Sequence, residues 1–220
     1  MPLPKEKNKD YFTYAQYKGW PEEERWEIID GQAYDMSPAP GTTHQEISVE
    51  ITRQIANYLI DKPCKVFAAP YDVFLPEDGE TEDETSTIVQ PDITVFCDLS
   101  KLSERGYTGP PDIVIEILSP SNASWDLIKK LALYERKGVK EYWIIHPSDK
   151  IVWKYVLAKE SYGKPFIYDE KNTPSFDLFP DFKLNLRKVF GLPENQVETV
   201  KEGPYPSSAR KKSSRKSKQQ

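Results

Sequence analysis

In the stretch "PPDIVIEILSPS", residues 110–121, an apolar run that begins after Asp112 contains one carboxylate, Glu116. Val114 and Leu118 share its strand face, and the neighbouring isoleucines form the other face. Because both faces are apolar, the run predicts a central strand that is covered on both sides. A carboxylate there costs several kcal/mol unless a cation, a metal or hydrogen bonds compensate its charge. Glu116 therefore belongs either to a functional site or to a buried ion pair, and the strand alone leaves both open.

The segment "WEIIDGQAYDMSP", residues 26–38, predicts two short strands around Asp30 and Gly31, a pair that favours a tight hairpin turn. A helix is expected next, because Thr43 and Glu46 have capping-box spacing. Apolar residues then recur at helical period: Ile47, Ile51, Ile55, Tyr58 and Leu59.

Further strands are predicted at 66–75, 88–98, 110–119, 139–147, 151–158, 161–169 and 176–186. The segment "SWDLIKKLALYERKG", residues 124–138, predicts a helix with Leu127, Leu131 and Tyr134 on one stripe and Gly138 at its end. This order indicates an α/β (α+β) fold with extra antiparallel strands.

A chain of 220 residues fits one domain with a substantial core, expected over 1–203 and centred on about 26–158. The start lacks an apolar signal-peptide core, and no run reaches the about 18 apolar residues of a membrane helix. We therefore expect a soluble, cytoplasmic protein with no membrane partner. Cys64 and Cys97 show no zinc-site or disulfide-framework spacing, and we expect two ordinary thiols.

The end of the chain, residues 204–220, holds six Lys or Arg and no acid. Since the net charge is -5, the remainder carries -5 minus 6, or -11. This composition predicts a disordered basic tail. Such a tail either contacts a nucleic-acid backbone or serves only solubility. The candidate contacts are Arg210, Lys211, Lys212, Arg215 and Lys216.

Two carboxylates enter from neighbouring strand candidates, Asp92 in "QPDITVF" and Glu116 in "IEIL". Carboxylate oxygens are the ligands that hard cations prefer, and Mg²⁺ is commonly held by one or two carboxylates with waters and substrate phosphate. Asp92 follows a proline at a strand start, where an aspartate is usually a turn or cap residue.

Lys130 is the third candidate, because it lies beside the buried stripe of its helix, three residues from Leu127 and four from Tyr134. Lys129 is turned about 100° away. The alternatives for Lys130 are an ammonium that extends into water and an ordinary ion pair with Asp126.

Together these residues resemble the PD-(D/E)xK phosphodiesterase superfamily and, more closely, the restriction-endonuclease-like proteins of its Uma-two family. The resemblance runs from about Trp26 to Pro147. It rests on the order of "WEIIDGQAYDMSPAP" with His44 following, "VQPDITVF", "PPDIVIEILSPSN", the Asp126, Lys130, Tyr134 series and "GVKEYWIIHP".

The resemblance implies a restriction-endonuclease-like mixed sheet flanked by helices. It also implies Mg²⁺ (or Mn²⁺) bound by Asp92, Glu116 and the backbone carbonyl of Ile117, and hydrolysis of phosphodiester bonds in nucleic acid, DNA foremost. Leu118 stands where the superfamily motif has its lysine. In this branch the following helix supplies the lysine, which corresponds to Lys130. His44, Glu46 and Glu50 are minor candidates for the same site.

Two rival functions stay open. One is a nuclease-like scaffold without turnover that binds nucleic acid or a protein, favoured by the acidic body and by Leu118. The other is an enzyme on the same scaffold with a different substrate. No sequence feature establishes dimerisation, although a nuclease that cuts both strands would commonly use a homodimer.

Overall fold

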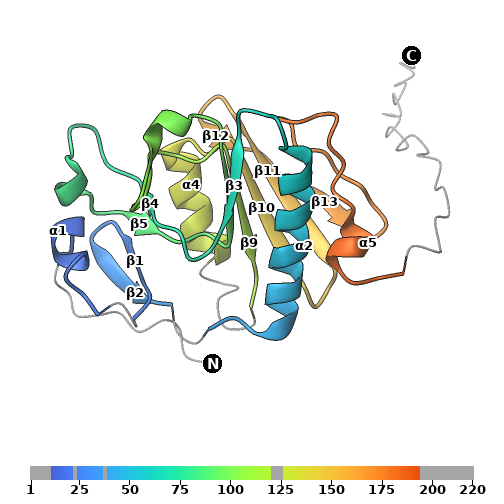
Figure 1. Cartoon of the computed structure of the whole chain (residues 1–220), viewed down its shortest axis with the longest axis horizontal. Coiled ribbons are helices and arrows are strands. Elements are labelled where there is room, and N and C mark those ends of the chain that lie inside the picture. Colours follow the sequence, from blue (N-terminus) through green and yellow to red (C-terminus); the bar gives the residue numbers. More distant parts are fainter. Residues whose placement is uncertain (1–10, 22–23, 37–38, 120–125, 194–220) are drawn as a thin grey trace, which may run out of the picture.

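Two β-sheets form the framework of the protein (Figure 1). The computed structural model describes residues 11–21, 24–36, 39–119 and 126–193, with the backbone alone at 126 and 127. The first sheet has the strand order β2-β1-β5-β4-β8-β7. The central sheet has the order β12-β11-β10-β9-β6-β3, with β13 also paired to β11.

The strands of the first sheet are β1 (Trp26–Ile29), β2 (Gln32–Asp35), β4 (Val73–Phe74), β5 (Ile88–Val89), β7 (Leu102–Ser103) and β8 (Gly106–Thr108). Those of the central sheet are β3 (Lys65–Ala68), β6 (Ile93–Phe96), β9 (Ile113–Ile117), β10 (Glu141–His146), β11 (Ile151–Ala158), β12 (Ser161–Tyr162) and β13 (Phe166–Asp169). The α-helices are α1 (Tyr14–Tyr17), α2 (Thr42–Tyr58), α4 (Leu131–Lys137) and α5 (Leu186–Val189). Short 3₁₀ turns cover Glu82–Glu84 and Leu99–Lys101, and a π-helical turn, Asp126–Lys130, leads into α4.

The central sheet is mixed, because β9 runs parallel to β10 and antiparallel to β6. The predicted hairpin is confirmed: β1 pairs with β2, and Asp30 and Gly31 both have positive φ in the turn. The predicted strands at 66–75 and 88–98 each divide into one strand for each sheet. Asp92 lies where the second of these segments passes from β5 to β6.

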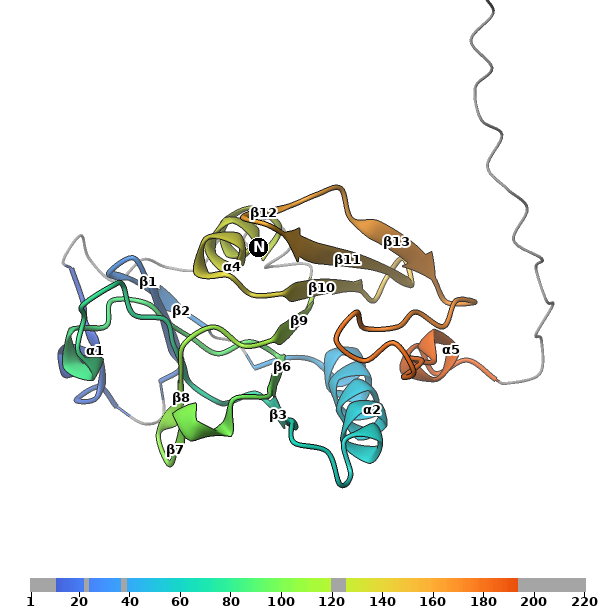
Figure 2. The same cartoon turned by 90° about the horizontal axis from the view of Figure 1, so that it is seen from above.

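The prediction that β9 is covered on both faces is confirmed. Ile113, Ile115 and Ile117 pack with α2 in one core. Val114 and Leu118 pack with α4 and the first sheet in another. Figure 2 shows α2 and α4 on opposite sides of β9 and β10. Glu116 therefore points toward α4.

Helix α2 has the predicted stripe, since Ile47, Ile51, Ile55 and Leu59 are buried. The predicted capping box is wrong: the N-cap is Gly41, which places Thr43 at the second helical position. The second predicted helix is confirmed from Asp126 onward, and Gly138 ends it in the left-handed region at φ 80°.

The predicted strand at 176–186 is wrong. Its phenylalanines recur every third residue, and backbone N–H groups of Phe179 and Phe182 donate to carbonyls three residues earlier. This segment therefore turns repeatedly, and it still buries its apolar side chains against α2 and the central sheet. Apolar content was a correct sign of burial, but the spacing did not fit a strand.

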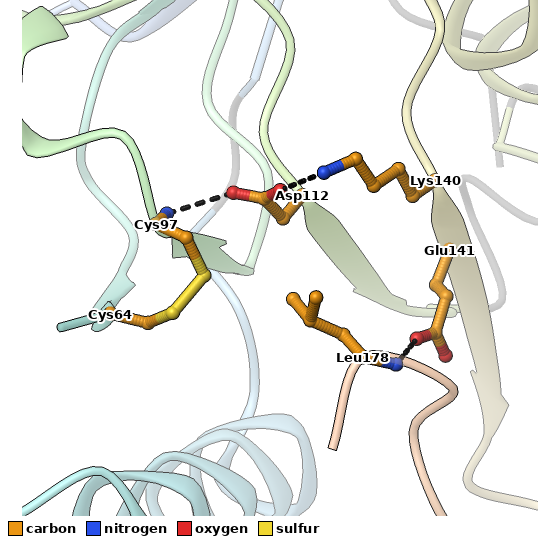
Figure 3. Close-up of a disulfide and its surroundings, with 6 residues drawn as sticks. All are labelled: Cys64, Cys97, Asp112, Lys140, Glu141 and Leu178. Carbon is orange, nitrogen blue, oxygen red and sulfur yellow. Dashed lines mark hydrogen bonds and ion pairs between the residues drawn. A yellow bond between two sulfur atoms is a disulfide. The ribbon is translucent and has the colours of Figure 1, made fainter. Parts of the chain in front are cut away.

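The expectation of two ordinary thiols is also wrong, because Cys64 and Cys97 form a disulfide (Figure 3). Cys64 precedes β3 and Cys97 follows β6, and these strands are antiparallel partners with Lys65 opposite Phe96. The two cysteines therefore face each other across the end of the pair, with Cα atoms 4.1 Å apart. The Cys97 backbone N–H donates to Asp112.

Residues 124–125, the side chains of Asp126 and Leu127, and the basic tail 204–220 lie outside the described residues. Across the described ranges, none of the helices combines the length and the apolar character that crossing a lipid bilayer requires.

Candidate active site

Glu116 lies at the centre of a buried polar cluster between β9 and the helical segment that follows it. Glu116 is 3% exposed. Oε1 accepts hydrogen bonds from the Lys130 ammonium and the Tyr134 hydroxyl, both at 2.9 Å. Lys130 and Tyr134 are four residues apart on one helical face, so a single segment delivers both donors to the carboxylate.

Lys130 is itself buried, at 1% exposure, and its ammonium also donates to Glu27 Oε1 at 3.0 Å. The expected divergence of the two lysines is confirmed. Lys129 is exposed, and its ammonium contacts the Tyr34 hydroxyl at 3.1 Å. The alternative in which Lys130 extends into water is excluded by its burial.

Glu27, on β1, is the residue of this cluster that sequence reasoning missed. It is fully buried, and Oε1 also accepts the backbone N–H of Gln90 at 2.9 Å. Its second oxygen, Oε2, is buried without a hydrogen-bond partner in the described part of the chain. The signal was available, because Glu27 interrupts the apolar run "WEII" as Glu116 interrupts "IVIEIL".

Asp92 meets Glu116 across the neighbouring strands. Ile93 pairs with Ile115 in the antiparallel β6–β9 register, which places Asp92 opposite Glu116. The Asp92 side chain is 17% exposed, and Oδ2 accepts the backbone N–H of Ile117 at 2.8 Å. The predicted convergence of the two carboxylates is therefore present, with the Asp92 backbone N–H 3.4 Å from Glu116 Oε2.

His44 joins the cluster, since its Nε2 lies 3.0 Å from Asp92 Oδ2. The structure does not bring Glu50 to the site, because that carboxylate accepts from Arg53 and Gln54 on its own helix. Glu46 is exposed, two residues after His44, and so lies on nearly the opposite face of α2 from it.

The pKa of the Tyr134 hydroxyl is raised well above its ordinary value, first by burial and then by the neighbouring Glu116 charge. Tyr134 therefore stays protonated and donates. Asp72, which accepts from the Gln90 side chain at 2.8 Å, has its pKa raised by burial and by Glu27. Burial is the largest cause of both pKa shifts, and the negative charges of Glu116 and Glu27 add to it.

The charge balance tests whether these residues fit a metal. Asp92, Glu116 and Glu27 bring three carboxylates and Lys130 brings one ammonium, so 3 minus 1 leaves an excess of two carboxylates over ammonium groups. Such an excess, with an unpartnered Glu27 oxygen, fits a hard cation. No group of three or more His, Cys, Asp or Glu within the described ranges converges on one point. The donor set therefore suits an ion such as Mg²⁺, which keeps waters and substrate oxygens among its ligands, and not a closed all-protein cage.

An open hollow of about 440 Å³ lies beside this cluster. It is lined by the first turn of α2, by the chain just after β9 and by the chain just after β10: Gly41, Thr42, Thr43, His44, Leu118, Ser119, Pro147 and Ser148. Because His44 both lines the hollow and contacts Asp92, it links the opening to the carboxylates.

A mixed sheet between helices, with paired carboxylates and a lysine at one end of its central strands, is the arrangement expected of a restriction-endonuclease-like protein. The Uma2 family model, described as "Putative restriction endonuclease", matches residues 13–187. The chain belongs to this family, which is the Uma-two family whose motifs its sequence resembles, and the match extends beyond those motifs at both ends.

Two further proteins are similar to this chain. An uncharacterized protein of Synechocystis sp. is 24% identical over 150 residues, which cover 68% of this chain and 73% of that protein. The crystal structure of "a putative nuclease belonging to DUF820" from Anabaena variabilis has a TM-score of 0.66 at 22% identity, and covers 82% of this chain and 98% of that one. This likeness confirms the fold class, a mixed sheet with flanking helices.

Proposed function

We propose that this protein is a metal-dependent endonuclease that hydrolyses phosphodiester bonds of nucleic acid, DNA foremost. The observation that carries the proposal is the ammonium of Lys130, held 2.9 Å from Glu116 Oε1 on the strand next to Asp92. A lysine from the following helix thus lies beside the carboxylate pair. This is expected if Lys130 takes the role of the motif lysine, whose position in this sequence is occupied by Leu118.

In this proposal Asp92 and Glu116, with the backbone carbonyl of Ile117, hold Mg²⁺ or Mn²⁺. When bound, such an ion polarises a phosphate oxygen and lowers the pKa of a bound water. Lys130 orients the attacking water or stabilises the negative charge that develops on the phosphate. Tyr134 and Glu27 keep Lys130 and Glu116 in place, and His44 keeps Asp92 in place.

The metal assignment is tested by calorimetric titration with Mn²⁺. The double variant Asp92→Ala, Glu116→Ala is expected to lose binding, because both carboxylates leave. The matched control is Glu141→Gln, which changes a buried glutamate on the neighbouring strand β10. Unchanged affinity in the double variant would place the ion elsewhere.

Turnover is tested by incubating the purified protein with plasmid, single-stranded DNA and RNA across Mg²⁺ and Mn²⁺, with EDTA as the control. Cleavage that requires the ion and Lys130 supports the nuclease. Absence of cleavage on every substrate favours the second candidate, a binding scaffold without turnover. That candidate is favoured by the ion pairs of Lys130 with Glu27 and Glu116, which account for its burial without any chemistry.

The tail and the oligomeric state belong to the same proposal. Arg210, Lys211, Lys212, Arg215 and Lys216 are proposed to contact phosphates. Truncation before Pro204 would then reduce the log–log salt slope of binding by up to about five units, at about 0.9 per phosphate. Cleavage of both strands of a duplex would use a homodimer, which sedimentation of the protein–DNA complex measures directly.

A further inference from the structure

A second hollow, of about 380 Å³, lies next to the hollow beside His44. Thr43 and Pro147 line both hollows, so the two adjoin at these residues, and together we call them the α2 groove. One end of the groove is His44, next to Asp92. The other end is lined by Lys150, from the β10–β11 turn, and Lys188, from α5.

Most of the polar side chains that line the α2 groove can donate a hydrogen bond. Hydroxyls come from Thr42, Thr43, Ser119 and Ser148, and ammonium groups come from the two lysines. Glu46 is the carboxylate that lines it. The first turn of the 17-residue helix α2 adds the positive end of its dipole, and its N-cap, Gly41, makes no side-chain cap. This combination favours an anionic ligand with several oxygens.

The position of the groove identifies that ligand. It starts at the candidate active site and leads along the surface to two exposed lysines. The chain before the tail carries -11, so most of its surface repels phosphate and a local basic path is needed to hold a polyanion. A phosphodiester strand has the matching repeat of anionic groups.

We propose that the α2 groove binds the phosphodiester backbone of the substrate strand on one side of the cleaved bond, with Lys150 and Lys188 neutralising its phosphates. The inference rests on the proposed nuclease function and adds to it the direction in which the substrate leaves the site. Base identity plays no part in this contact, because phosphate contacts position a strand without reading its sequence.

The test is the salt dependence of binding, measured by fluorescence anisotropy with labelled single-stranded and duplex DNA in EDTA, so that no bond is cut. The full chain is used, which keeps the tail constant. In the variant Lys150→Gln, Lys188→Gln, the log–log slope is expected to fall by about 1.8 on duplex and about 1.4 on single-stranded DNA.

The matched control is Lys159→Gln, Lys164→Gln. Lys150 and Lys159 are both exposed and both have positive φ, at 54° and 62°, and they flank β11 at its two ends. Eight strand residues separate them by about 26 Å. The control removes the same charge from a similar turn far from the groove.

A fall in slope that is confined to the groove variant supports the proposal. An equal fall in both variants, no fall in either, or no binding by the unaltered chain overturns it. The nuclease function is judged separately: cleavage with an unchanged slope in the groove variant overturns the groove alone. A groove-dependent slope without cleavage in Mg²⁺ or Mn²⁺ overturns the nuclease alone.

Discussion

Two buried lysine–glutamate clusters lie on neighbouring strands of the central sheet, and they differ in how completely their polar atoms are paired. On β10, Glu141 is 1% exposed. Its Oε1 accepts the Leu178 backbone N–H at 3.0 Å (Figure 3). Its Oε2 accepts Trp143 Nε1–H at 3.1 Å and lies 3.3 Å from the Lys154 ammonium. Both oxygens of this carboxylate are therefore satisfied.

Lys154 completes that cluster by donating to the Ser175 carbonyl at 2.8 Å and to the Asp177 carboxylate. Three acceptors match the three protons of an ammonium. Ser175 and Asp177 belong to the irregular segment after β13, so this cluster fixes that segment to the sheet. Its role follows from its contacts alone.

The cluster around Glu116 is paired less completely. Its one ammonium, on Lys130, serves two buried carboxylates, and Glu27 keeps one oxygen without a partner among the described residues. A groove opens beside it through His44. The comparison teaches that burial of a charged pair does not indicate function, whereas unbalanced charge next to an opening does.

The largest expected effect is on stability, in the complete cluster. Lys154→Met leaves Glu141 buried without its cation, and is expected to lower the free energy of unfolding by about 3–5 kcal/mol. Urea denaturation measures it. Turnover per folded molecule should stay unchanged, because Lys154 lies on the α2 side of the sheet, away from Glu116. A loss of turnover in this variant would remove the distinction between the clusters.

Lys130→Met is expected to reduce turnover by about 10²–10³, the scale for one preorganised electrostatic group, or about 2.7–4 kcal/mol. It also breaks a buried pair, so initial rates are compared per folded molecule. Lys129→Met is the matched control, since that neighbouring ammonium is exposed and contacts Tyr34. Similar losses in both variants would show a general charge effect.

The sequence predicted the parts of this site that depend on local periodicity, and missed the part that depends on contacts between distant segments. Period two placed Glu116 on one face of its strand, and helical period placed Lys130 beside the stripe that faces it, so local rules found both. Glu27 belongs to a strand of the other sheet. Its contact with Lys130 could not be inferred from sequence, because it depends on how the two sheets pack together in the folded protein. The burial of Glu27 could have been inferred, since it lies in the apolar run "WEII".

The disulfide and the segment at 176–186 show the same limit in the fold. Cys64 and Cys97 meet because β3 and β6 are paired in one register, and no sequence spacing gives a register between strands. In 176–186 the apolar residues correctly indicate burial. Their spacing of three residues favours turns, however, and does not fit the two-residue period of the strand that was predicted. Sequence periodicity thus predicted most helices and strands, whereas the residues that meet at the site depend on how those elements pair.

A smaller effect tests the second donor to Glu116. Tyr134→Phe removes one hydrogen bond to a charged group and is expected to destabilise the protein by about 1.5–3 kcal/mol. Tyr155→Phe is the matched control, because Tyr155 lies in the same core and its contacts are with aromatic rings. Thermal unfolding of both variants gives the difference. Equal shifts would mean that the Tyr134 hydroxyl adds nothing at Glu116.

The smallest effect concerns His146, the last residue of β10, which lies on the same face of the sheet as Glu116. Its Nε2 is buried and has no hydrogen-bond partner among the described residues. Burial lowers the pKa of His146, and the Asp149 charge opposes this. Because the pKa is lower in the folded state, His146 becomes protonated in the unfolded chain at a higher pH than in the folded protein. Stability is therefore complete above the ordinary histidine pKa of about 6.5 and falls as pH decreases through the folded pKa.

His146→Gln is expected to remove this part of the pH dependence, while His44, the other histidine of the chain, stays in both proteins. Asp149→Asn should lower the His146 pKa further and make the loss larger. Urea unfolding between about pH 5 and 8 measures the slopes. If His146→Gln has the slope of the unaltered chain, His146 has the same pKa in the folded and unfolded states, and its buried nitrogen contributes nothing to the pH dependence of stability.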